Sequence, residues 1–175
     1  IYPPVDVDKI KPLQKKKYVL SVGRFSGYLR DKKQKVLIDA FKKLYQEKVV
    51  SGWSLHLAGS ASEGDKDYID ELKENAKGIP VNFYPNLRYG ELVKLYGQSS
   101  IYWHSAGFAE EDPTKMEHFG ITTVEAMAGG CVPVVIGKGG QTEIVEHGKS
   151  GFLWNNLGEL QNLTLRLINE DNLWK

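Results

Sequence analysis

Short apolar runs alternate with helical patterns along most of this chain. The runs are four to six residues long, which is typical of strands buried in a sheet, and they occupy residues 18–22, 53–58, 81–84, 100–103 and 132–136. Apolar residues that recur at helical spacing predict helices over residues 36–45, 65–76, 91–96, 121–128, 144–147 and 157–168. This alternation predicts an α/β fold, a Rossmann-like, doubly wound parallel sheet with helices on both faces.

The chain is predicted to contain one domain preceded by a linker. Residues 1–17, with early prolines and a solvated basic run at 15–17, indicate the linker, and residues 18–175 make up the domain. The 41% apolar residues, 26% charged residues and formal charge of +1 are typical of a globular protein and give no indication of nucleic-acid binding. No apolar run approaches the roughly 20 residues that a membrane span needs. The single Cys131 can form no internal disulfide, which fits a reducing, cytoplasmic setting.

Ligands of doubly wound sheets bind at the carboxyl ends of the strands. Three unusual loops follow predicted strands and should therefore meet at one edge. They contain Gly23-Arg24, Glu117 and Gly139-Gly140. The convergence of these loops, which are distant in sequence, predicts a binding site at that edge.

Basic residues and glycines supply groups for an anion there. The guanidinium of Arg24 can form two hydrogen bonds with a phosphate, and the ammonium of Lys32 can add positive charge. Gly139 and Gly140 allow backbone N–H groups to approach an anion closely. Plainer interpretations stay open, namely a solvated basic patch for Arg24 and Lys32 and a tight turn for the two glycines.

Glu117 and Glu125 are separated by seven residues and flank the start of a predicted helix. The residues at this start are Phe119, Gly120 and Ile121. Free amides and the helix dipole favour an oxyanion there, and the two carboxylates suit neighbouring sugar hydroxyls because they accept hydrogen bonds. The spacing alone carries little weight, since Glu63 and Glu71 share it, and two solvated carboxylates remain the alternative.

Other site classes find little support in the sequence. Residues 23–27 form neither the G-x-G-x-x-G dinucleotide fingerprint nor a P-loop, which disfavours a Rossmann dehydrogenase and a P-loop kinase. The four histidines have no metal-ligand spacing, so no metal site is expected. Two D-x-D sequences, at residues 6–8 and 65–67, are expected to be solvated or to cap a helix.

An ordered series of motifs resembles glycosyltransferase family 4, the group 1 retaining glycosyltransferases of GT-B fold. The resemblance covers about residues 18–170, and the series is far more specific than any one of its members. The motifs are Val22-Gly23-Arg24, Glu117-x-Phe119-Gly120-Ile121, Glu125-Ala126-Met127-Ala128, Pro133-Val134-Val135, Gly139-Gly140-Gln141-Thr142-Glu143-Ile144-Val145 and Gly148-x-x-Gly151-Phe152-Leu153.

The resemblance implies roles for the matching residues. As catalytic groups, Arg24 and Lys32 would hold the donor diphosphate, and Glu117 would bind the transferred sugar. The donor-binding residues would be Phe119, Gly120, Ile121, Glu125 (on the ribose), Gly139, Gly140, and Tyr84 and Leu87 (beside the base). The family usually has glycine after its phosphate-binding lysine, where this chain has Lys33, so Lys32 and Lys33 both remain candidates.

A GT-B enzyme has two Rossmann-like domains, of which the N-terminal one mainly binds the acceptor. The chain resembles the C-terminal, donor-binding domain, so the resemblance implies a missing N-terminal domain, a truncated C-terminal end and a fragment that is inactive on its own. The implied enzyme transfers sugar from a UDP-, GDP- or ADP-sugar to an unknown acceptor with retention of configuration and needs no metal or cofactor.

The alternatives are a GT-B relative such as a nucleotide-sugar epimerase or phosphorylase, and a nucleotide-sugar-binding module without activity. The expected location is the cytoplasm, with peripheral membrane contact only through the missing domain.

Overall fold

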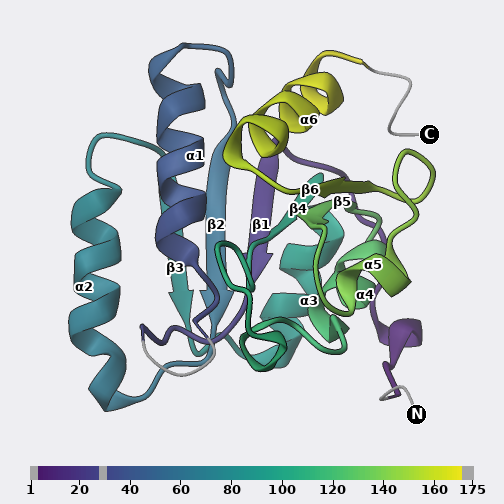
Figure 1. Cartoon of the computed structure of the whole chain (residues 1–175), viewed down its shortest axis with the longest axis horizontal. Helices are drawn as coiled ribbons and strands as arrows, with labels where there is room; N and C mark the ends of the chain where they lie inside the picture. The colour runs from purple at the N-terminus through teal and green to yellow at the C-terminus, as the bar shows by residue number, and fades with distance from the viewer. Residues whose placement is uncertain (1–3, 28–30, 171–175) are drawn as a thin grey trace.

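The computed structural model describes residues 4–27 and 31–170, which form a three-layer α/β domain (Figure 1). The strands of these residues form one parallel sheet in the order β3-β2-β1-β4-β5-β6. They are β1 (Tyr18–Val22), β2 (Ser54–Gly59), β3 (Val81–Pro85), β4 (Ile101–His104), β5 (Val132–Ile136) and β6 (Phe152–Trp154). The α-helices are α1 (Gln34–Gln46), α2 (Lys66–Asn75), α3 (Tyr89–Gln98), α4 (Ile121–Ala128), α5 (Gln141–Ile144) and α6 (Leu157–Asn169), and the 3-10 turns are η1 (Val7–Lys9), η2 (Glu63–Asp65) and η3 (Pro113–Lys115).

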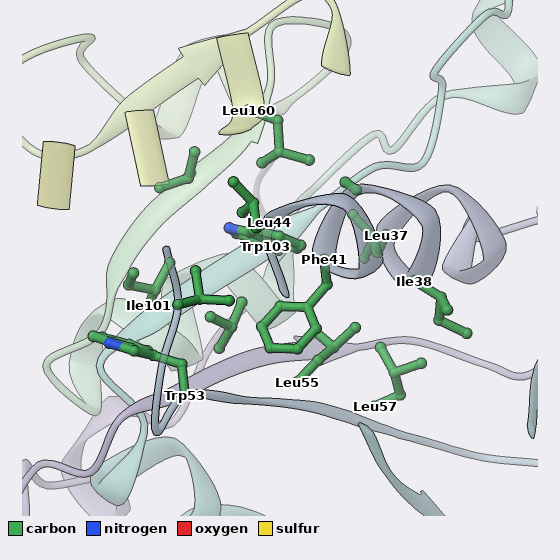
Figure 2. Close-up of a cluster of buried hydrophobic side chains, with 14 of the residues drawn as sticks. Leu37, Ile38, Phe41, Leu44, Trp53, Leu55, Leu57, Ile101, Trp103 and Leu160 are labelled. Carbon is green, nitrogen blue, oxygen red and sulfur yellow. The ribbon is translucent and has the colours of Figure 1, made fainter. Parts of the chain in front are cut away.

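The sheet buries both of its faces, because successive side chains of a strand point to opposite sides. Leu55, Leu57 and Trp103 pack beneath α1, and Phe41 of α1 meets Trp103 edge to face at 6.3 Å (Figure 2). On the other face, Leu20 of β1 and its neighbours pack beneath α3 and α4. Strands buried on both faces have near-continuous apolar sequences, and the predicted doubly wound sheet is confirmed.

The strand order reverses between β1 and β4. The chain runs outward from β1 through β2 to β3, then returns to place β4 on the other side of β1 and continues to β6. The crevice at the carboxyl ends of β1 and β4 is the topological switch point of the sheet, where ligands of such folds bind. The segment that begins at Gly23 leaves β1 at this point, and residues 105–120 leave β4.

One predicted element is wrong. The helix predicted over residues 144–147 is instead α5, which begins at Gln141 and ends at Ile144, and Val145 is extended. Gly139, with φ +58, turns the chain early, and the Thr142 hydroxyl donates to the Gly139 carbonyl at 2.9 Å. His147 pairs with Gly151 in an isolated bridge, so the chain at this point leads toward β6 rather than continuing the helix.

The segment before β1 is attached to the domain. Ile10 is 1% exposed, and the N–H of Leu13 donates to the Gly97 carbonyl at 3.0 Å. The Lys15 ammonium is not simply solvated, because it donates to the carbonyls of Ser99, at 2.8 Å, and of Gly129. These carbonyls belong to the last turns of α3 and α4. The role of this segment as an interdomain linker stays a prediction.

Within residues 4–27 and 31–170, the helices are too short or too polar to cross a bilayer.

We expect Gly59→Ala to destabilise the domain. The loops after β1 and β2 touch at this glycine, and a Cβ atom there would overlap the backbone carbonyl of Gly23. Because the obstacle is backbone, overpacking should lower the free energy of unfolding by about 1–3 kcal/mol, measured by urea denaturation. Gly90→Ala, in open space on α3, is the matched control and should be neutral or stabilising by up to about 1 kcal/mol. Equal effects of the two substitutions would contradict the close approach.

Candidate functional site

A pocket of about 440 Å³ opens at the carboxyl edge of the sheet. The loops after β1, β2 and β3 form one side, and the first turns of α3 and α4 form the other. The lining residues are Val22, Gly23, Arg24, Gly59, Ser60, Asn86, Leu87, Leu92 and Thr122. Of the residues predicted for the site, Arg24 and Leu87 therefore line this pocket directly.

The turn that presents Arg24 is fixed by the backbone. Its carbonyl accepts a hydrogen bond of 2.9 Å from the side-chain amide of Gln34, which is buried at the start of α1. Tyr68 of α2 in turn donates to the Gln34 side chain at 3.0 Å. The Arg24 side chain itself is exposed at the pocket, and no ion pair to it is formed by the part of the chain that the structure describes. Its charge is therefore free to meet an anion.

Lys32 and Glu117 form an ion pair beside this turn. The Lys32 Nζ donates to Glu117 Oε2 at 2.5 Å, and the two side chains are 25% and 19% exposed. The Lys32 stem also packs on Gly23, where a Cβ atom would lie 2.8 Å from Lys32 Cγ. The loops after β1 and β4, predicted to converge, therefore meet through this pair.

The Glu117 carboxylate is held ionised. Burial alone would raise its pKa, but the neighbouring His104 ring and the Lys32 ammonium together hold the pKa well below its ordinary value. His104 Nε2 lies 3.6 Å from Glu117 Oε2. Burial lowers the pKa of His104, and the nearby carboxylate only partly opposes this effect. The site in this state thus combines an ionised glutamate, a lysine and a neutral imidazole.

Lys33 points elsewhere. Its φ of +57 turns the chain just before α1, and its Nζ donates to Glu110 Oε1 at 2.8 Å and lies 3.5 Å from Asp31. The hydrogen bond with Glu110 is the main reason that the pKa of Lys33 is raised. Of the two lysines that the sequence left as candidates, Lys32 is the one that contacts Glu117.

Glu117 also closes the amino end of α4. Its Oε1 accepts long hydrogen bonds of 3.4 Å from the backbone N–H groups of Phe119 and Gly120, and Gly120 begins the helix with φ +60. The carboxylate therefore occupies the position where helix amides and the helix dipole favour an anion. The side chains of Phe119 and Ile121 are 50% and 39% exposed.

Gly139 and Gly140 reach the site in a different way from the one that the sequence predicted. The N–H of Gly140 donates to the Glu117 carbonyl at 2.8 Å, so in this structure it is not free for an anion. A Cβ atom on Gly139 would overlap the Glu117 carbonyl, and one on Gly140 would overlap the His118 carbonyl. The two glycines therefore let the loop after β5 support the backbone of the Glu117 loop.

Glu125 lies one turn inside α4. The hydroxyl of Tyr96, from α3, donates to Glu125 Oε2 at 2.8 Å and joins the two helices. Burial raises the pKa of Tyr96 well above its usual value, so this hydroxyl remains a donor. One carboxylate oxygen is thereby held in place, and no described residue donates a hydrogen bond to the other, which can accept from a hydroxyl.

Tyr84 does not face the pocket in this structure. Its hydroxyl lies 3.0 Å from His56 Nδ1, and the two rings stack with 5.7 Å between centroids. Burial lowers the pKa of His56 to about 4, so the histidine is neutral in this stack. In the segment predicted to lie beside the base, the pocket is lined by Asn86 and Leu87 and not by Tyr84.

Several pocket residues were missed. Gly59 and Ser60 follow β2 at the same edge, and the rule applied to the other loops would have found them. His104, which lies beside Glu117 and not in the pocket lining, was also missed: the predicted strand ends at residue 103, whereas β4 ends at His104, and a polar residue at a strand's carboxyl end marks the same edge. Among the described residues, no group of three or more His, Cys, Asp or Glu side chains is arranged to hold a metal ion.

A family model described as "Glycosyl transferases group 1" matches residues 5–171. The GDP-Man:Man(3)GlcNAc(2)-PP-Dol alpha-1,2-mannosyltransferase of Xenopus tropicalis is 30% identical over 169 residues, which cover 87% of this chain and 32% of the relative. Alpha-1,3/1,6-mannosyltransferase ALG2 of Dictyostelium discoideum is 29% identical over an alignment 184 residues long, which covers 95% of this chain and 41% of the relative. The chain spans about a third of the length of several such curated relatives.

Solved structures are similar over nearly the whole chain. Anabaena Alr3699/HepE, in complex with UDP and glucose, superposes with a TM-score of 0.75 at 25% identity and covers 99% of this chain and 48% of that protein. A second structure is the C-terminal domain of LpcC, a glycosyl transferase group 1 family protein from Francisella tularensis. It superposes with a TM-score of 0.74 at 20% identity, and the match covers 98% of this chain and 91% of that domain. The second similarity concerns the fold alone.

We expect the Lys32–Glu117 pair to be strongly coupled in stability. Lys32→Met, Glu117→Gln and the double variant form a mutant cycle, which urea denaturation should resolve at about 1–3 kcal/mol because both side chains are mostly buried. The pKa of Glu117 is lower in the folded protein than in the unfolded chain. The coupling is therefore fully present above pH 4.5, the ordinary pKa of a glutamate, and is progressively lost as the pH falls below it.

The Lys35–Glu71 pair is the matched control. It has the same chemistry at 2.7 Å, but its side chains are 56% and 57% exposed, so its coupling should stay below about 1 kcal/mol and fall with salt. Equal coupling in the two pairs would contradict the partial burial of the Lys32–Glu117 pair.

Proposed function

The chain belongs to the group 1 glycosyl transferases, and on this basis we propose that it binds the nucleotide diphosphate sugar of a retaining, family 4 type glycosyltransferase. The observation that carries this proposal is that Arg24 lines the pocket at the switch point of the sheet, while the Lys32–Glu117 pair lies beside it, with the Lys32 stem against Gly23. The relatives named above are transferases, so the epimerase and phosphorylase alternatives are not favoured.

Each group has a chemical part in this proposal. Arg24 and Lys32 bind the diphosphate, where negative charge develops as the sugar leaves, and preorganised donors at such a place stabilise the transition state. Glu117 accepts hydrogen bonds from the transferred sugar, and the free oxygen of Glu125 accepts them from the ribose. The base lies between the loops of Ser60 and Leu87 in the pocket.

The relatives narrow the choice of donor. The name of the Xenopus tropicalis protein includes GDP-Man, which makes GDP-mannose our first candidate. The Anabaena structure holds UDP and glucose, which makes UDP-glucose the second. The acceptor would be bound by the part of the enzyme that this chain does not include. Transfer without a metal, and a cytoplasmic location, stay predictions.

Titration calorimetry of the chain with GDP, UDP, ADP, GDP-mannose and UDP-glucose tests the proposal. We expect one nucleoside diphosphate and its sugar to bind in the micromolar to millimolar range, without added divalent metal. A pocket of about 440 Å³ with a free arginine is adequate for a nucleotide. Absence of binding to all five compounds at millimolar concentration would overturn the proposal.

The diphosphate assignment predicts a specific pattern among basic residues. Arg24→Ala and Lys32→Met should each weaken nucleoside diphosphate binding by about 10- to 100-fold, because each removes a hydrogen bond between charged groups. Lys33→Met is the control, since its ammonium pairs with Glu110 and Asp31 instead of with Glu117, and it should change affinity by less than about threefold. Stronger loss in Lys33→Met than in Lys32→Met would reverse the assignment of the two lysines.

A further inference from the structure

His104, at the end of β4, is buried in an unusual way. Its side chain is 4% exposed, and neither ring nitrogen has a hydrogen-bond partner among the described residues. A buried polar group without a partner destabilises the folded state, and native structures hold few of them. The function proposed above does not use this imidazole. The nearest acceptor is Glu117, whose pKa the ring already helps to lower, but the contact between them is too long for a formed hydrogen bond in this structure.

The nearest acceptor is already engaged. His104 Nε2 lies 3.6 Å from Glu117 Oε2, slightly beyond hydrogen-bonding distance, and the same oxygen accepts the 2.5 Å bond from Lys32. The lysine thus holds the carboxylate close to itself and short of the imidazole. A shift of well under 1 Å would bring the ring and the carboxylate into contact.

Donor binding makes opposing demands on the Lys32–Glu117 pair. If the proposed function is right, Lys32 binds the diphosphate, so its bond with Glu117 must weaken or break. Glu117 would then be left mostly buried, with a negative charge and without its cation. An uncompensated charge of this kind is strongly destabilising. A replacement donor is needed at the moment when the diphosphate draws Lys32 away.

We propose that Glu117 exchanges partners on donor binding, with the Nε2–H of His104 taking the place of the Lys32 ammonium. The imidazole then keeps Glu117 ionised and turns its other oxygen toward the sugar hydroxyls. His104 is therefore a positioning residue that acts through Glu117, and this inference rests on the proposed function. A neutral ring suffices, because it carries one N–H and Glu117 needs one donor.

The test compares two substitutions at one position. Leucine removes the donor and fills the space with apolar atoms, whereas glutamine places an N–H donor near the position of Nε2. We expect His104→Leu to weaken binding of GDP and GDP-mannose, or of UDP and UDP-glucose if the wild type selects uridine, by about 10- to 100-fold. His104→Gln should stay within about threefold of wild type. The unliganded His104→Leu protein should melt at the same temperature as wild type or higher, since an unsatisfied polar group is removed.

A mutant cycle with Glu117→Gln separates positioning from a general structural role. A neutral glutamine needs no replacement donor, so His104→Leu should cost nothing further in that background. In the wild-type protein, the ring ¹⁵N resonances of His104 should move when the nucleotide is added, which tests the exchange without any substitution.

Three results would overturn the inference: wild-type affinity in His104→Leu, a full additional loss in the Glu117→Gln background, or unchanged ring resonances on saturation with nucleotide. Failure of the proposed function would look different, because the wild type itself would bind none of the nucleotides.

Discussion

The candidate site depends on Glu117, because this residue joins three loops that are distant in sequence. Its carboxylate accepts from Lys32 in the loop after β1 and from amides at the start of α4, and its carbonyl accepts from Gly140 in the loop after β5. The carboxylate stands at the switch point, where the reversal of strand order opens a crevice. A single side chain on a long loop therefore fixes the geometry of the sheet edge.

The unliganded site satisfies its own charges, which has a consequence for binding. Lys32 and Glu117 neutralise each other, and Glu117 takes the anion position at α4, so a ligand with both phosphate and hydroxyl groups must compete with internal partners. Affinity then reflects the difference between the new contacts and those given up. Arg24 lies outside this competition, because its guanidinium is exposed and without an ion pair among the described residues. It is therefore suited to meet the proposed diphosphate first.

The sequence predicted the sheet better than it predicted the site. Strands buried on both faces leave long apolar runs, which is why five of the strands were found, whereas β6 is only three residues long and follows the misplaced helix. The convergence of loops at one edge followed from topology and is confirmed. The orientation of Tyr84 toward His56, the engaged N–H of Gly140 and the choice between Lys32 and Lys33 each depend on a local turn or a neighbouring strand. Residue type and spacing carry no information on such contacts.

Contacts at the carboxyl ends of α3 and α4, away from the pocket, also influence its shape. Lys15 donates to carbonyls in the last turns of both α3 and α4, where a cation is favoured by the helix dipoles. The same two helices are joined by the hydrogen bond from Tyr96, in the last turn of α3, to Glu125, near the middle of α4, and their first turns supply Leu92 and Thr122 to the pocket. Because both contacts hold the helices together near their carboxyl ends, they restrict how far the first turns of α3 and α4 can separate at the pocket. The segment before β1 therefore helps to set the width of a pocket that it does not touch.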